Sequence, residues 1–158
     1  MSLTTEFLER RGVPFEAISH EKAFTSIDEA RALGIHADEV VKTLLLDTPA
    51  GHVLTAIPGD RRLDMKLVEE AVGARRAHLA TEAEIEREYP EYELGCLPPI
   101  GSLLGVQEYV DPDVTRHETI VFAAGSQTES VKVRTRDLFD REQIVVARLT
   151  RQPADEYV

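Results

Sequence analysis

The stretch Val40-Val41-Lys42-Thr43-Leu44-Leu45-Leu46 decides the fold, because every position is apolar except one lysine and one threonine. Such a run predicts a buried strand. The turn sequence Thr48-Pro49-Ala50-Gly51 then predicts a hairpin, with a second strand at residues 52–57. Because side chains alternate along a strand, Lys42 is expected to share a face with Val40, Leu44 and Leu46.

Strand and helix patterns alternate outward from this hairpin in both directions. Two capping-box sequences, Ser26-Ile27-Asp28-Glu29 and Thr81-Glu82-Ala83-Glu84, predict helix starts. The other predicted elements are helices at residues 4–11, 63–73 and 135–139, and strands at 14–19, 76–80, 105–110, 119–124, 129–133 and 143–149. This mixture excludes a regular doubly wound parallel sheet. We expect an α/β fold (mixed α+β) in which a single mixed, barrel-like β-sheet is surrounded by helices.

Length and charge limit the possible classes of function. A chain of 158 residues is expected to form a single domain, residues 1–158, with a frayed tail at 152–158. Its 29 acidic and 18 basic residues give a net charge of −11, which excludes a generally basic nucleic-acid binder but allows a local phosphate site. The sequence shows neither a signal peptide nor a membrane span, so a cytoplasmic protein with no membrane partner is expected.

Several common catalytic motifs are absent from the sequence. It contains no nucleophile elbow, no phosphate-binding glycine-rich loop and no dinucleotide-binding motif. A single cysteine, Cys96, excludes an internal disulfide and a cysteine-rich zinc site. The five histidines have no spacing typical of zinc ligands. We therefore expect neither a metal nor another cofactor.

Three features remain that could carry chemistry. Lys42 either extends its amine to water along an apolar stem or acts as a phosphate or carbonyl ligand on a rigid strand. The segment from Gly95 to Ser102, which encloses Pro98-Pro99, is either an ordinary turn or a loop whose amides converge as an oxyanion hole. The turn Gly125-Ser126-Gln127-Thr128 either only connects two strands or contributes hydroxyl groups to a pocket.

A set of motifs runs through the chain in a particular order. They are Thr25 ahead of Ile27-Asp28-Glu29-Ala30, VVKTLLL at 40–46, Ile57-Pro58-Gly59-Asp60, residues 79–85, Gly95-xxx-Pro99, Tyr109-Val110-Asp111, and Ala124-Gly125-Ser126. In order and spacing they resemble the YbaK/EbsC family of freestanding aminoacyl-tRNA deacylases, which is related to the editing domain of bacterial prolyl-tRNA synthetases. The resemblance covers a core of about residues 15–140 and leaves a C-terminal strand and tail at 141–158.

This resemblance implies a hydrolase that removes a mischarged amino acid from tRNA by cleaving the aminoacyl ester. The catalytic residues that it implies are Lys42, Gly95 and Pro99, and the substrate-binding residues are Thr25, Gly101, Asp111, Gly125 and Ser126. An aminoacyl ester is already activated, so a positioned water and oxyanion-binding amides of residues 95–101 can supply most of the acceleration. The chain departs from relatives at Ala123 and Gln127, which leaves the cognate amino acid open.

The implied partner, a mischarged aminoacyl-tRNA, is itself acidic, so a local basic patch has to bind it. Five basic residues cluster within residues 61–76: Arg61, Arg62, Lys66, Arg75 and Arg76. They are either tRNA contacts or a solvated helix face with compensating acids. Delivery of the tRNA by an aminoacyl-tRNA synthetase or an elongation factor would compensate for weak binding of the tRNA to this patch. The sequence does not determine the oligomeric state.

Two rival functions follow from the same residues. The first is a non-catalytic module that binds aminoacyl-tRNA ends or aminoacyl nucleotides in the same pocket. The second is a hydrolase of another small ester or thioester. A comparison of binding with turnover on a panel of mischarged tRNAs separates these possibilities.

Overall fold

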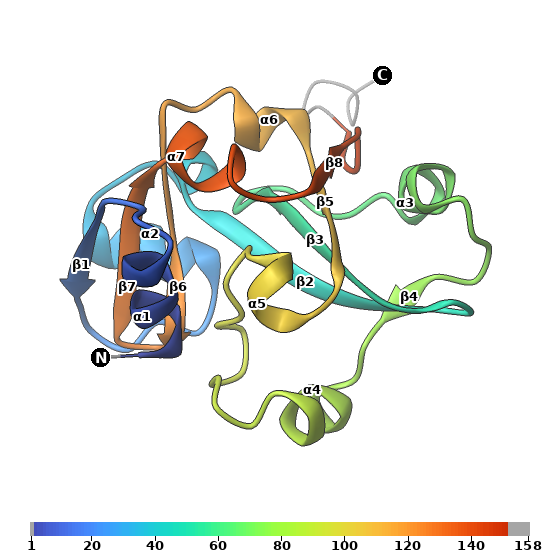
Figure 1. The fold of residues 1–158 in the computed structure, drawn as a ribbon. Helices are drawn as coiled ribbons and strands as arrows, with labels where there is room; N and C mark the ends of the chain where they lie inside the picture. Colours follow the sequence, from blue (N-terminus) through green and yellow to red (C-terminus); the bar gives the residue numbers. More distant parts are fainter. Residues whose placement is uncertain (1, 152–158) are drawn as a thin grey trace.

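The computed structural model describes residues 2–151, in which short helices surround two β-sheets (Figure 1). The tail expected at 152–158 lies outside the described residues. The strands are β1 (Phe15–Ser19), β2 (Val41–Thr48), β3 (Gly51–Pro58), β4 (His78–Leu79), β5 (Gln107–Val110), β6 (Thr119–Ser126), β7 (Glu129–Arg134) and β8 (Ile144–Val146). The helices are α1 (Leu3–Arg10), α2 (Ser26–Leu33), the 3₁₀ helix η1 (Ala37–Glu39), α3 (Met65–Val72), α4 (Glu82–Glu88), α5 (Gly101–Leu104), α6 (Pro112–Thr115) and α7 (Thr135–Phe139).

The mixed α/β class is confirmed, but the expected single sheet is divided in two. The larger sheet has the strand order β4-β2-β3-β5-β8, and the smaller has the order β1-β7-β6. An isolated parallel bridge between Val40 and Val121 joins them just before β2 begins. The division was not visible in the sequence because local periodicity predicts a strand without identifying its partner. Instead of closing into one barrel-like sheet, the two sheets enclose an apolar core.

The β2–β3 hairpin forms as predicted, with an antiparallel register from Val41 opposite Pro58 to Thr48 opposite Gly51. Its two faces contact different parts of the core. Leu46 packs in a cluster with Val68 of α3, and Leu44 lies against that cluster. Leu45 packs on the opposite face with Leu97 of the proline-containing loop. The predicted alternation of β2 is confirmed, and it places the stem of Lys42 on the α3 side.

The connections around β3 make the larger sheet mixed. β5 runs parallel to β3, and β8 runs parallel to β5, whereas β4 pairs antiparallel with the end of β2. Since β4 contains only two residues, most of the outer edge of β2 has no strand beside it. Within residues 2–151, no helix has the length and apolar character needed to cross a bilayer.

Candidate active site

Three loop segments meet beside β2. A Cβ added to Gly95 would lie 3.3 Å from the carbonyl oxygen of Phe24, and one added to Gly59 would lie 2.8 Å from Cβ of Ser26. The main-chain amide of Ala23 donates to the carbonyl of Gln127 over 2.8 Å. The segment from Ala23 to Ser26 therefore contacts all three: the end of the hairpin, the proline-containing loop and the β6–β7 turn.

A hollow of about 250 Å³ lies along the uncovered outer edge of β2. Its walls include Thr43, Leu45, Leu79, Ile85, Gly95 and Leu97. The amide of Ala80 donates to the carbonyl of Leu45 at this edge. Because main-chain groups alternate in direction along a strand, those of Thr43, two residues earlier, point to the same edge. The hollow thus has apolar side walls and main-chain polar groups at its border.

Two amides of the segment from Gly95 to Ser102 have no acceptor among the residues that the structure describes. The amides of Cys96, Ile100, Gly101 and Ser102 all donate within the protein, and the two prolines have no amide hydrogen. Among the residues that the structure describes, the amides of Gly95 and Leu97 have no acceptor. Gly95 has φ +78°, a left-handed conformation that glycine adopts without strain. Gly95 and Leu97 are therefore the two residues of this segment whose main-chain N–H groups have no partner among residues 2–151.

Pro99 and Gly101 support the loop from below. Pro99 is buried, and the amide of Gly101 donates to the Glu108 carboxylate over 2.9 Å. A Cβ on Gly101 would come within 2.6 Å of the Val106 carbonyl oxygen, so only glycine fits there. Because its amide is already bonded, Gly101 holds the loop in place, and no group of it remains to bind substrate directly.

Lys42 extends along the α3 side of the sheet. Its Nζ donates to the carbonyl oxygen of Arg61 over 2.6 Å, and among residues 2–151 it forms no ion pair within 4 Å. Burial lowers the pKa of the amine, while the charge of Asp60 opposes that shift. The amine does not border the hollow beside Gly95. It is a half-buried cation whose single hydrogen-bond partner is a neutral carbonyl.

Two of the predicted substrate-binding residues have structural partners. Thr25 is the N-cap of α2, and its hydroxyl accepts from the amide of Asp28 over 3.1 Å. Asp111 is fully buried and accepts from the amides of Asp113, Leu149 and Thr150. All of these partners lie within the fold. Through them Asp111, the N-cap of α6, holds the segment that follows β8. The structure therefore does not bring Asp111 to the hollow.

The predicted turn Gly125-Ser126 lies next to the beginning of the loop. Gly125 has φ +102°, and a Cβ there would lie 3.0 Å from the ring of Tyr92. The carbonyl of Gly125 accepts from the amide of Glu93 over 2.9 Å, and Gln127 Nε2 donates to the carbonyl of Leu94. The hydroxyl of Ser126 accepts from the amide of Thr128 within the turn. The turn thus fixes the start of the loop.

Behind this turn lies a buried polar chain that the sequence analysis did not identify. The hydroxyl of Ser130 donates to the carboxylate of Glu29, and His20 Nε2 lies 2.8 Å from the same hydroxyl. His20 Nδ1 faces the carbonyl of Glu21 over 2.6 Å. Burial raises the pKa of Glu29, and the bond from Ser130 and the nearby His20 oppose that shift. No spacing in the sequence links these residues, because they come from separate elements.

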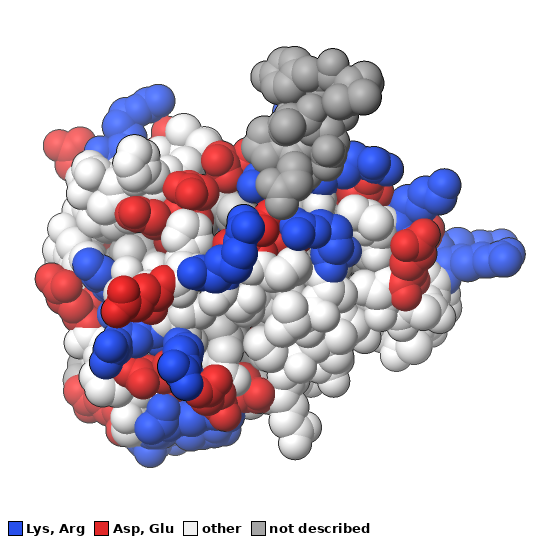
Figure 2. Space-filling view, turned by 90° about the horizontal axis from the view of Figure 1, so that it is seen from above, with Lys and Arg blue, Asp and Glu red and all other residues white. Residues whose placement is uncertain are grey.

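The predicted basic cluster is partly used inside the protein. The guanidinium of Arg61 is largely buried and pairs with Asp113 over 2.8 Å, so it is not a surface contact. Arg62, Lys66, Arg75 and Arg76 are exposed on and around α3. Figure 2 shows basic side chains projecting from the edge of the molecule where Figure 1 places α3, with acidic groups between them.

No side chain at the hollow is an activated nucleophile. Burial raises the pKa of the Cys96 thiol to about 12, so it stays protonated at neutral pH. Thr43 also lines the hollow, and sequence reasoning passed over this residue. The alternation of β2 could have indicated it.

Comparison with known proteins shows what the chain is similar to. The family model of the aminoacyl-tRNA editing domain matches residues 20–140. The multifunctional Ser/Thr-tRNA deacylase ProXp-y of Escherichia coli (strain K12) is 29% identical over 135 residues, which cover 82% of this chain and 80% of that protein. A proline–tRNA ligase of Xanthomonas axonopodis pv. citri is 33% identical over 100 residues, 63% of this chain and 18% of the ligase.

Solved structures share the same fold. The crystal structure of the hypothetical protein APE2540 superimposes with a TM-score of 0.86 at 25% sequence identity. The alignment covers 95% of this chain and the whole of that one.

Proposed function

Because the chain belongs to the aminoacyl-tRNA editing domain family and is an aminoacyl-tRNA deacylase, we propose that it cleaves mischarged aminoacyl esters in the hollow beside β2. The observation that carries this assignment is the pair of unbonded amides, Gly95 and Leu97, at the border of an apolar hollow. Two amide donors beside apolar side chains match the requirement for an oxyanion hole.

The reaction follows from these donors. A water oxygen attacks the ester carbonyl carbon, and the carbonyl oxygen becomes an oxyanion that accepts from Gly95 and Leu97. The bond to the ribose oxygen then breaks, that oxygen takes a proton, and the free amino acid and the tRNA leave. The neighbouring ribose hydroxyl orients the water, since the carboxylate that lines the hollow, Glu82, is exposed in the first turn of α4 and solvated there.

Lys42 binds the phosphate or ribose end of the terminal adenosine. Within residues 2–151 its amine has only the neutral carbonyl of Arg61 as hydrogen-bond partner, and an anionic phosphate is a stronger acceptor. The flexible stem allows the amine to move from that carbonyl to a phosphate. The ring of Phe24 is 61% exposed, and the terminal base stacks on it beside Lys22, whose Nζ lies 5.3 Å from the ring centroid. Arg62, Lys66, Arg75 and Arg76 contact the tRNA backbone from the α3 side.

Incubation of the purified protein with a panel of mischarged tRNAs tests this function, with Lys42→Ala as the variant. We expect the variant to lose about 10- to 100-fold in deacylation, the equivalent of one hydrogen bond to a charged group. Lys132→Ala, an exposed strand lysine on β7, is the matched control and should retain full activity. Binding of charged tRNA without hydrolysis by the wild-type protein would instead identify a non-catalytic module.

The exposed basic residues lead to a separate prediction about the affinity of the protein for tRNA. If each of the four contacts one phosphate, affinity for tRNA falls with salt, and each substitution by alanine reduces the slope by about one unit. Arg61→Ala is the informative comparison, because its guanidinium pairs with Asp113 and should contribute to stability rather than to this slope. Weak binding on this surface is consistent with delivery by a synthetase or an elongation factor in the cytoplasm.

A further inference from the structure

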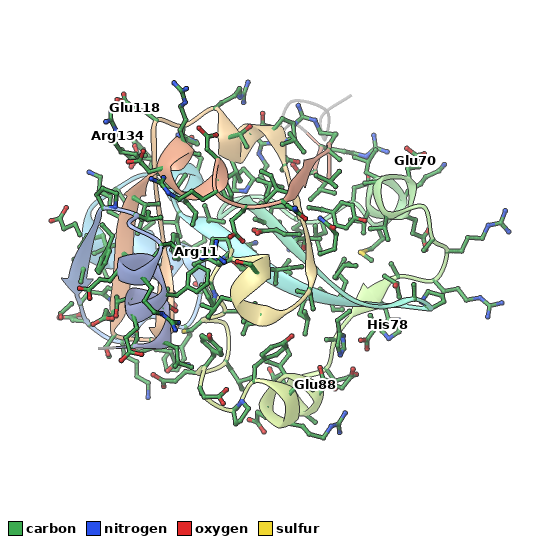
Figure 3. The ribbon with its side chains drawn as sticks, in the orientation of Figure 1. Arg11, Glu70, His78, Glu88, Glu118 and Arg134 are labelled. Carbon is green, nitrogen blue, oxygen red and sulfur yellow. The ribbon has the colours of Figure 1, made fainter. Side chains whose placement is uncertain are left out.

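A group of histidines and carboxylates lies at the turn end of the β2–β3 hairpin. Asp47 and His52 are opposite each other across the hairpin, and Glu84 comes from α4. One ligand atom from each of these three residues lies within 4.8 Å of the others. His78 of β4 adds a second imidazole, with Nε2 3.6 Å from Asp47 Oδ2. Figure 3 shows His78 and Glu88 on the same side of the hairpin.

The imidazole of His52 is held with one nitrogen directed into this group. Its Nε2 lies 2.7 Å from Glu88 Oε2, which fixes the ring and favours a proton on that nitrogen. Its Nδ1 is buried and lies 2.5 Å from Asp47 Oδ1, yet it makes no hydrogen bond within residues 2–151. A nitrogen lone pair facing a carboxylate oxygen is repulsive unless a proton or a metal ion lies with them.

We propose that Asp47, His52 and Glu84 bind one divalent transition-metal ion, with Zn²⁺ preferred. Imidazole nitrogen and carboxylate oxygen together form a donor set that zinc accepts, whereas magnesium and calcium favour oxygen alone. Tetrahedral bonds of about 2.0–2.1 Å place ligand atoms about 3.3 Å apart. One of these separations is the 2.5 Å between His52 Nδ1 and Asp47 Oδ1, and all of them lie within 4.8 Å, so small side-chain rotations complete the shell.

Two neighbours complete the site. His78, which is exposed, supplies the fourth ligand or leaves that position to water. Glu88 accepts from the other imidazole nitrogen, the arrangement in which a carboxylate orients a metal-bound histidine. A divalent ion also relieves the repulsion between the neighbouring carboxyl groups of Asp47 and Glu84, which raises the pKa of Asp47 when no ion is present. The expectation of no metal considered only linear spacing, whereas these ligands come from four different elements.

The bound ion would join α4 to the hairpin. α4 also carries Ile85, which lines the hollow proposed to bind the aminoacyl ester. The ion therefore stabilises one wall of that hollow from outside, without contact with the amides of Gly95 and Leu97. The site does not depend on the proposed function, since none of its ligands takes part in the hydrolysis described above.

Calorimetric titration of untagged, chelator-treated protein with Zn²⁺ tests this site, together with thermal unfolding with and without the ion. We expect one equivalent of zinc to bind and to raise the unfolding midpoint by several degrees. His52→Ala and Glu84→Gln should each weaken binding by about 100-fold or more, since even indirect partners of a ligand contribute 10- to 100-fold. His36→Ala, an exposed histidine outside the group, should bind zinc as the wild type does.

Two results would contradict the proposed zinc site. Absence of saturable zinc binding by the wild-type protein would show that a protonated His52 bridges Asp47 and Glu88, and the proposal is then wrong. Equal zinc binding by His52→Ala and wild type would place the ion elsewhere and would also reject the site. Glu84→Gln guards against misfolding, because glutamine can keep the capping-box bonds of Glu84 with Thr81 and the change lies outside the hairpin.

Discussion

Ser130 donates a hydrogen bond to Glu29, and both side chains are buried although they lie on β7 and α2. His20 approaches the same hydroxyl from the other side. His20 Nδ1 lies 2.6 Å from the carbonyl oxygen of Glu21, so the imidazole, the hydroxyl and the carboxylate form one continuous chain of polar contacts between β7 and α2.

Ser130→Ala should destabilise the protein by about 1–3 kcal/mol at pH 8, because it leaves a buried carboxylate without its donor. The effect should be smaller at pH 5. Since the folded-state pKa of Glu29 is raised, its carboxyl becomes protonated as the pH falls and then needs that donor less. Urea denaturation at both pH values measures the difference. Ser19→Ala, on the exposed part of β1, is the control and should change stability little at either pH.

Gly95→Ala should reduce deacylation at least tenfold, because the new Cβ approaches the Phe24 carbonyl and displaces the amides of the oxyanion hole. Alanine in a left-handed conformation also costs about 1 kcal/mol of stability. Gly12→Ala has the same strain, with φ +69°, but no atom lies within 4 Å of its Cβ. The control should therefore lose similar stability and keep its activity. Equal activity of the two variants would remove Gly95 from the site.

Glu108→Gln should make the protein more stable above neutral pH. Burial raises the pKa of Glu108 from 4.5 to about 8, so the folded state favours the protonated form. The contribution of this residue to stability is therefore complete below pH 4.5 and is lost as the pH rises to about 8.

The neutral glutamine avoids this loss and still accepts from Gly101, so we expect a gain of about 1–3 kcal/mol at pH 8.5 and little gain at pH 4.5. Urea denaturation across this range measures it. Glu118→Gln is the matched control, since Glu118 is highly exposed and pairs with Arg134 (Figure 3). A gain in stability that does not depend on pH would contradict the raised pKa of Glu108.

Asp111→Ala decides between a structural role and the substrate-binding role that the family resemblance implies. The change leaves buried donors of Asp113, Leu149 and Thr150 without an acceptor. We expect a loss of about 3–5 kcal/mol in unfolding free energy. Deacylation per folded molecule should remain near the wild-type value. A stable variant with a raised KM would instead support substrate binding.

Local signals in the sequence were sufficient for most of the helices and strands. The predicted capping box at Thr81 and Glu84 is present, with bonds in both directions. The helix start at Ser26 was misplaced by one residue, because Thr25 is the N-cap of α2. Glu29, expected to close a capping box, is instead buried against Ser130. A tertiary bond between distant elements took precedence over the local pattern.

The candidate site was harder to predict, because it also depends on contacts between elements that are distant in the sequence. The face of Lys42 follows from strand alternation, but its contact with Arg61 depends on how the chain turns after β3. The glycines and prolines indicated a stiff loop at residues 95–101. Which of its amides have no acceptor depends on Glu93, Glu108 and Glu142, which no motif connects with the loop. The division into two sheets likewise rests on pairings distant in sequence.

The amides of Gly95 and Leu97 belong to the main chain, and this has an evolutionary consequence. Replacing any side chain that surrounds the hollow leaves both hydrogens where they are, provided that the backbone keeps its course. On the proposed assignment, selectivity resides in Leu79 and Ile85 while bond cleavage resides in the peptide groups. The wall can then be rebuilt for a different amino acid by successive substitutions, and each intermediate protein continues to hydrolyse its ester.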